Sequence, residues 1–141
     1  MTERATSADL VVPSDLAEVR RIQDAIESDL QANRFGESDQ FAVKLAVEEA
    51  LVNAIKHGNQ MDSAKSVRVR YSVDDERFEI RITDQGPGFN PSDLPDPTDE
   101  FNLERPCGRG VLLIRSFMSS VEFVGSGNEL LMTKDKTPVE E

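Results

Sequence analysis

The chain has 141 residues and carries 27 acidic against 16 basic side chains, so its formal net charge at pH 7 is −11. Such an acidic chain repels the phosphates of nucleic acids, and a bound polyphosphate needs local help from a metal ion or from Gly-rich backbone. The single cysteine, Cys107, excludes an intramolecular disulfide and a zinc cluster, and no apolar run has the length of a signal peptide or a membrane span. We therefore expect a cytoplasmic protein without nucleic-acid or membrane contact, folded as one domain over residues 1–141 with a flexible tail from about residue 135.

The first part of the chain predicts a strand and then a helix. Residues 8–12 form an apolar run of strand length, which Pro13 ends. Ser14 or Asp15 can cap the helix that follows, over residues 16–33. Its apolar side chains recur at helical spacing on one face, which we expect to lie against the core: Leu16, Val19, Ile22, Ile26 and Leu30.

Residues 41–59 predict a longer helix that has two separate polar stripes. Ser38 can cap its start, and the Gly-Asn pair at positions 58 and 59 can end it. At about 100° per residue, Lys44 and Glu48 fall together on the first stripe, where we expect an ion pair at the solvent edge.

The second polar stripe holds Glu49 and Asn53, a carboxylate and an amide one helical turn apart, ~6 Å. Their neighbours Ala42 and Ala46 are small, which leaves room beside the pair. An unpaired buried carboxylate is costly, so Glu49 faces either water or a group that compensates its charge. Mg²⁺ prefers oxygen ligands and keeps several waters, so Asn53 can supply one ligand while Glu49 accepts a proton from a hydroxyl or a water. From this pair alone, a polar patch on an amphipathic helix is an equally good interpretation.

Residues 66–73 and 78–83 alternate apolar and polar side chains, which predicts two strands joined by a turn at residues 74–76. The apolar positions belong to the core face of this hairpin. The polar positions, which we expect on the opposite face, include Arg68, Arg70, Glu79 and Arg81.

The second of these strands runs into a short motif of Asp84, Gly86 and Gly88. Glycines at alternate positions let the backbone turn sharply and approach a flat ligand closely. A buried Asp84 carboxylate can accept a hydrogen bond from an exocyclic amino group, which distinguishes adenine from guanine. Taken in isolation, an ordinary Asp-x-Gly turn at a strand end fits these residues better.

The rest of the chain predicts a long loop, a helix and a second hairpin. Residues 90–107 are rich in Pro, Asp and Glu and show little periodicity, and a loop of this length is usually functional or mobile. A helix over residues 111–118 and two strands, 121–124 and 129–133, follow. Clustered strands with the helices to one side indicate an α+β two-layer sandwich with a mostly antiparallel sheet.

A second glycine motif, Gly108-Arg109-Gly110, opens the helix after the loop. Free N–H groups at a helix N-terminus form an anion site suited to phosphate, and Arg105 and Arg109 add positive charge nearby. A helix start that happens to contain glycine also fits. The chain has no Gly-x4-Gly-Lys-Ser/Thr motif and no His-Arg-Asp or Asp-Phe-Gly motif, which excludes a P-loop protein and an ordinary protein kinase.

The order and spacing of these three motifs resemble the N box and the two glycine boxes of the GHKL ATPases, which include gyrase B, Hsp90, histidine kinases and MutL. The likeness covers nearly the whole chain and implies the Bergerat type of α+β sandwich. Within this superfamily, the bacterial anti-sigma-factor serine kinase branch is most similar to this chain. The similarity lies in the short length and in the segment Glu49-Ala-Leu-Val-Asn53-Ala-Ile-Lys-His57-Gly58.

The resemblance implies a role for each motif residue, with ATP and Mg²⁺ as cofactors. Glu49 matches the general base and Asn53 the magnesium ligand, while Asp84 would recognise adenine. Residues 90–107 would form a lid over ATP, from which Arg105 approaches the phosphates. Glycine positions and one arginine would shape the adenine wall and cradle the phosphate chain: Gly86, Gly88, Gly108, Arg109 and Gly110.

The resemblance also implies an activity and partners. Such proteins bind a sigma factor, phosphorylate a serine on a STAS-type anti-anti-sigma antagonist and usually form homodimers. The alternative is a non-catalytic module that sequesters a regulator by partner switching and uses nucleotide only as a conformational ligand. Two features depart from the family pattern: residues 127–129, Gly-Asn-Glu, replace the common Gly-Thr-x, and Pro106-Cys107 stiffens the approach to Gly108.

Overall fold

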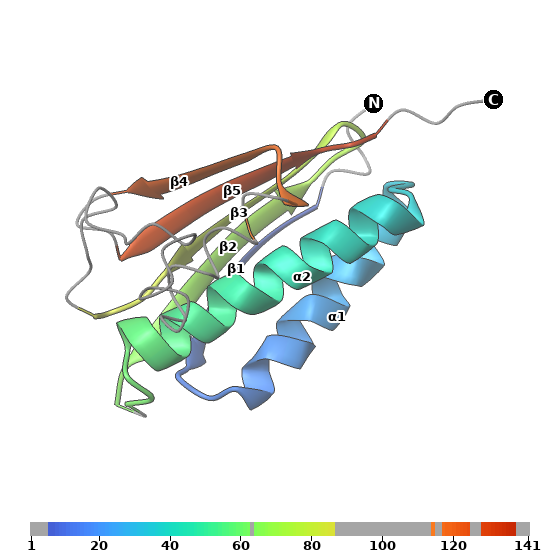
Figure 1. The fold of residues 1–141 in the computed structure, drawn as a ribbon. Coiled ribbons are helices and arrows are strands. Elements are labelled where there is room, and N and C mark those ends of the chain that lie inside the picture. Colours follow the sequence, from blue (N-terminus) through green and yellow to red (C-terminus); the bar gives the residue numbers. More distant parts are fainter. Residues whose placement is uncertain (1–5, 63, 87–113, 115–116, 125–127, 138–141) are drawn as a thin grey trace.

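The computed structural model describes residues 6–62, 64–86, 114, 117–124 and 128–137. A five-stranded sheet forms one layer, and two long helices lie side by side across one of its faces (Figure 1). The elements follow in the order β1 (Thr6–Pro13), α1 (Ala17–Ala32), α2 (Glu37–Asn53), a π-helical turn (Ala54–Gly58), β2 (Ser66–Val73), β3 (Arg77–Thr83), β4 (Ser120–Val124) and β5 (Glu129–Asp135).

The strand order across the sheet is β1-β2-β3-β5-β4, and every neighbouring pair is antiparallel. The predicted α+β two-layer sandwich, with helices on one face, is therefore confirmed. The turn between β2 and β3 is also where we predicted it. Asp74 Oδ1 accepts hydrogen bonds from the backbone N–H groups of Glu76 and Arg77, both at 2.8 Å, and so closes the turn.

The core lies between the sheet and the helices. Alternation along β2 and β3 directs valine, isoleucine, phenylalanine and tyrosine side chains towards the helices. The apolar face of α1 is buried as predicted, except for Leu16, which precedes the helix and is 37% exposed. Ile114 and Met118 also belong to the core, and the Met118 N–H donates to the Ile114 carbonyl at 3.1 Å, the i to i−4 bond of the predicted helix.

Helix α2 begins four residues earlier than we predicted. Gly36 stands at its N-terminus in an extended conformation, and the Ser38 side chain does not cap it. The α-helical turns end at Asn53, and the π-helical turn carries the chain to Gly58, where we predicted the end. The Asn59 N–H donates to the Ala54 carbonyl at 2.8 Å, five residues back, which is the bond that defines a π-helical turn.

Residues 135–137, the start of the predicted flexible tail, form a strand end and hydrogen bonds, while residues 138–141 lie outside the description. Asp135 is still part of β5. Lys136 Nζ donates to the Asn33 carbonyl at 2.6 Å. The backbone N–H and the hydroxyl of Thr137 donate to the two carboxylate oxygens of buried Asp39, at 2.8 and 2.7 Å. These bonds tie the end of β5 to the α1–α2 connection, because Asp39 lies in the first turn of α2.

Candidate functional site

The two glutamates of α2 have different surroundings. Glu48 is exposed, whereas Glu49 is half-buried beside the buried Ala46 and Ala50, as the helical spacing predicts. Lys44 and Glu48 both face solvent, but they do not form the predicted ion pair among the salt bridges of the described residues. Ordering two long exposed side chains costs about as much entropy as a screened ion pair returns.

Asn53 follows Glu49 by one turn and closes the α-helical part of this segment. It is half-buried, like Glu49, so both side chains lie at the boundary between the core and solvent. The π-helical turn starts at the next residue, and such turns are frequent at functional sites. The helix thus presents a carboxylate and an amide on one edge, close to the point where its geometry changes.

Asp84 follows the last residue of β3, and three hydrogen bonds to Gly86 and Asn128 hold it in place. Its carboxylate Oδ1 accepts a hydrogen bond from the Gly86 N–H at 2.8 Å. Its backbone N–H donates to the Asn128 carbonyl at 2.9 Å, and Asn128 Nδ2 donates to the Asp84 carbonyl at 3.1 Å. Burial raises the pKa of the Asp84 carboxyl, although the Gly86 hydrogen bond and the positive charge of Lys65 oppose the shift.

Glycines bring the end of the long helix into direct contact with the Asp84 turn. A Cβ atom at Gly58 would lie less than 3.0 Å from the Asp84 carboxyl atoms, and one at Gly86 would lie as close to the Gly58 carbonyl. We predicted that Gly86 allows a ligand to approach the backbone. In the described structure the backbone that approaches it is the chain's own, at Gly58. The contact joins the Glu49–Asn53 helix to the Asp84 motif, which were predicted separately.

The sequence did not single out Asn59 or Asn128 as part of this site. Asn59 served only to end a helix, and Asn128 only as a departure from the family's pattern. Asn59 is completely buried, and its side-chain oxygen accepts a hydrogen bond from the Gln85 N–H at 2.7 Å. Both asparagines therefore hold the backbone of the Asp84 turn, and their partners lie too far away in the chain for a local pattern to reveal them.

The predicted phosphate side of the site lies outside the described residues. The same is true of the predicted lid over residues 90–107. The site residues concerned are Arg105, Gly108, Arg109 and Gly110, and Gly88 of the predicted adenine wall lies outside the description as well.

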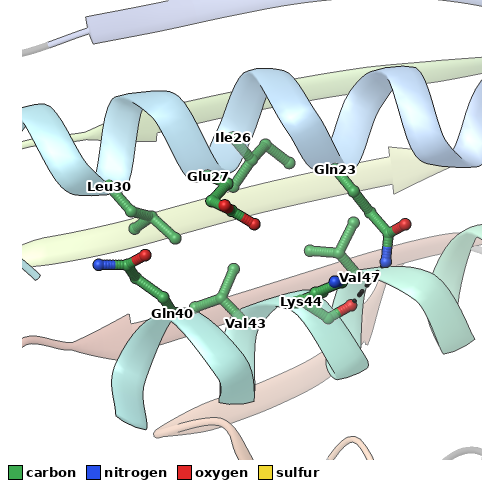
Figure 2. Close-up of a pocket in the computed structure, with 8 residues that line it drawn as sticks. All are labelled: Gln23, Ile26, Glu27, Leu30, Gln40, Val43, Lys44 and Val47. Atoms are coloured by element: carbon green, nitrogen blue, oxygen red, sulfur yellow. Dashed lines mark hydrogen bonds between the residues drawn. The ribbon is translucent and has the colours of Figure 1, made fainter. Parts of the chain in front are cut away.

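Two hollows of the described surface lie away from these residues. The hollow between α1 and α2 is lined by side chains such as Ile26, Leu30 and Val43, and Gln23 Nε2 crosses it to the Lys44 carbonyl at 3.0 Å (Figure 2). Its volume of about 10 Å³ is no larger than one water molecule. A nucleotide cannot enter it.

The other hollow is an open depression of about 540 Å³ on the sheet face away from the helices. Its arginines are paired within the sheet: Arg70 lies 3.0 Å and Arg81 lies 3.6 Å from the carboxylate of Glu129. At its edge, Arg68 donates two hydrogen bonds to Asp9, at 3.0 and 2.7 Å. The predicted outward arginines thus form ion pairs across strands, on the opposite side of the sheet from Glu49 and Asn53.

Helices cover one face of the antiparallel sheet, and one of these helices carries a carboxylate and an amide and meets an Asp-x-Gly turn. This combination defines a class of nucleotide-binding domain. Residues 12–134 match the family described as the histidine kinase-like ATPase domain. The chain belongs to this family, and its relatives place it in the anti-sigma kinase branch.

Serine-protein kinase RsbW of Bacillus licheniformis is 32% identical over 99 residues, which cover 65% of this chain and 62% of that protein, less than two thirds of its length. Anti-sigma F factor of Clostridium perfringens (strain SM101 / Type A) is 34% identical over 98 residues, covering 65% and 69%. The crystal structure of the RsbU and RsbW domains of Rv1364c from Mycobacterium tuberculosis aligns with a TM-score of 0.64 over 94% of this chain and 33% of that one. At 14% identity this last likeness shows the fold alone.

No helix in the described parts of the chain combines the length and the apolar character needed to cross a membrane.

Proposed function

We propose that the chain is an ATP-dependent anti-sigma regulatory serine/threonine kinase. It would bind a sigma factor and phosphorylate a serine on a STAS-type anti-anti-sigma protein, acting in the cytoplasm as a homodimer in which residues 1–141 fold as one domain. The observation that carries the proposal is the contact of Gly58 with the Asp84 carboxyl. This contact supports the proposal because it joins the helix that carries Glu49 and Asn53 to the Asp84 turn. The names of the relatives, serine-protein kinase RsbW and anti-sigma F factor, support the activity and the partners.

The described residues fit an adenine nucleotide with Mg²⁺. Asp84 is half-buried and fixed by its backbone, so its carboxylate can accept a hydrogen bond from the exocyclic amino group of adenine without reorganising. Asn53 offers an amide oxygen at the edge of the core, which suits a hard cation that keeps most of its waters. Mg²⁺ would supply charge neutralisation on the phosphate oxygens. We assign Gly88 to the adenine wall. On the phosphate side we assign Arg105, Gly108, Arg109 and Gly110 to the phosphate chain.

Glu49 would act as the general base of the transfer. It lies one turn before Asn53 and is half-buried, so its carboxylate can orient the hydroxyl of the partner's serine. The serine oxygen then forms a bond to the γ-phosphorus while the bond from that phosphorus to the bridging oxygen of ADP breaks. The hydroxyl proton passes to Glu49, and phosphoserine and ADP are the products.

Replacing Glu49 tests this assignment. Glu49→Gln keeps the shape of the side chain but cannot take the proton, so we expect transfer of labelled phosphate to the antagonist to fall about 10²–10⁴-fold while ATP affinity stays the same. Glu48→Gln is the matched control, because Glu48 is the exposed neighbour on the same helix and should transfer at the wild-type rate.

Full transfer activity in Glu49→Gln would remove Glu49 from the mechanism. If the wild-type chain binds ATP but transfers no label to any candidate antagonist, the chain is instead a nucleotide-responsive module that sequesters a regulator.

A further inference from the structure

Asn59 is a buried amide at a junction of four segments. Its Nδ2 group donates to Ser14 Oγ at 2.8 Å and to the Ser66 carbonyl at 2.9 Å. Its Oδ1 atom accepts from the Gln85 N–H at 2.7 Å. One side chain therefore connects the end of the long helix with the β1–α1 link, the start of β2 and the turn after β3. It is 0% exposed, and removing the amide would take this partner away from all three groups, although the Ser14 hydroxyl would keep its bond to the Lys65 carbonyl.

The bond to Gln85 has a particular consequence for Asp84. Gln85 lies between Asp84 and Gly86 in the chain. The Asp84 carboxylate Oδ1 accepts a hydrogen bond from the Gly86 N–H. The turn is thus held at two successive backbone N–H groups, one by Asn59 and one by the Asp84 carboxylate. The Gln85 side chain adds a third link, because its Oε1 accepts from the Ser66 N–H at 2.7 Å. The direction of the Asp84 carboxylate depends on this turn, and Asn59, directly after the long helix, holds the turn through the Gln85 N–H.

We propose that Asn59 is a positioning residue for base recognition. Through the Gln85 N–H it fixes the Asp84 turn relative to the helix that carries Glu49 and Asn53, so that the Asp84 carboxylate meets the exocyclic amino group of adenine. The inference rests on the proposed function, since it concerns the same nucleotide site. It differs from a purely structural role, which would lower stability without changing which base is preferred.

The test compares two nucleotides and two variants. ATP and purine ribonucleoside triphosphate differ only in the exocyclic amino group, so the ratio of their affinities, measured by calorimetry with Mg²⁺, reports the amino contact alone. Asn59→Ala should reduce the preference for ATP about tenfold or more, because a hydrogen bond to a charged group is lost or misaligned. The affinity for purine ribonucleoside triphosphate should change much less.

Ser14→Ala is the matched control. Ser14 is also buried, 4% exposed, and bonds to the same amide, but its described side-chain hydrogen bonds go to Asn59 and Lys65 and not to Gln85. Loss of the Ser14 hydroxyl should lower the midpoint of urea unfolding and leave the preference for ATP unchanged. Asn59→Ser is measured beside Asn59→Ala in case the alanine variant does not fold, because a hydroxyl can keep part of the polar network yet is too short to reach Gln85. The same loss of preference is expected for it.

The outcomes separate the two proposals. A wild-type chain that binds neither nucleotide overturns the proposed function, and this inference with it. A wild-type chain that prefers ATP, together with Asn59 variants that keep the same preference, overturns this inference alone. An equal loss of preference in Ser14→Ala would also overturn it, because the effect would then belong to the general stability of the junction.

Discussion

At the scale of single residues, Asp84 illustrates how a candidate site works against the stability of the fold. Its carboxyl is half-buried, and burial raises its pKa above the ordinary value. The folded chain therefore holds the proton more tightly than the unfolded chain does. The contribution of Asp84 to stability consequently falls as pH rises from the ordinary carboxyl range through the raised pKa. Above the raised pKa the ionised Asp84 opposes folding, as expected for a group that we propose binds a ligand through its charge.

Asp84→Asn should therefore stabilise the chain at neutral pH. An amide oxygen can still accept from the Gly86 N–H, and the buried charge is gone. We expect the free energy of unfolding at pH 7 to rise by about 0.5–2 kcal/mol, the usual size of one stabilising substitution. The gain should shrink as pH falls towards the ordinary carboxyl range, because the wild-type carboxyl is then neutral too. Urea unfolding over a pH series measures this, and a variant that is less stable than the wild type at pH 7 would contradict it.

At the scale of elements, the end of the long helix decides whether the site forms. The π-helical turn brings Gly58 against the Asp84 carboxyl, and Gly86 packs on the Gly58 carbonyl. The approach of Gly86 to Gly58 involves backbone on both sides, so it cannot relax by rotating a side chain. This close contact and the Asn59 hydrogen bond to Gln85 both couple the Glu49–Asn53 helix to the strand end.

Gly86→Ala should disturb this contact. The added methyl group meets the Gly58 backbone, and we expect a loss of about 1–3 kcal/mol in the free energy of unfolding, as for other overpacked sites. Gly36→Ala is the control, because a Cβ at Gly36 meets nothing within 4 Å and its φ of −71° suits alanine. Its effect should stay below about 1 kcal/mol. Equal losses in the two variants, measured by urea unfolding, would refute the packing argument.

The bonds of Thr137 to Asp39 give a second prediction at this scale. Thr137→Val removes the hydroxyl but keeps the backbone N–H, so the buried Asp39 carboxylate loses one of its two bonds to that residue. We expect a loss of about 1–2 kcal/mol in the free energy of unfolding. Thr133→Val is the comparison, since its hydroxyl is paired with Ser120 at the surface, and it should lose less than about 0.5 kcal/mol. A Thr137→Val variant as stable as the wild type would mean that the C-terminal segment does not anchor the helices.

At the scale of the whole molecule, the sequence predicted the elements and their layers but not how distant parts meet. The alternation in β2 and β3 gave their bounds to within one residue, because a half-buried sheet imposes a period of two. The position of β5 between β3 and β4 was not predictable, since pairing between distant strands leaves no local signal. For the same reason the sequence predicted only that Asn59 ends a helix. Its side chain bonds to residues of three other segments, Ser14, Ser66 and Gln85.

The proposed function requires Asn53 to hold Mg²⁺ for an ATP bound beside Asp84. Thermal unfolding of the wild type and of Asn53→Ala, with saturating ATP in Mg²⁺ and again in EDTA, tests it. ATP at one hundred times Kd stabilises by about 2.7 kcal/mol, which raises Tm by several degrees. We predict this rise for the wild type with Mg²⁺, a much smaller one in EDTA, and no Mg²⁺-dependent part in Asn53→Ala. A wild-type Tm that ATP does not change, or that rises equally in EDTA, would contradict the claim.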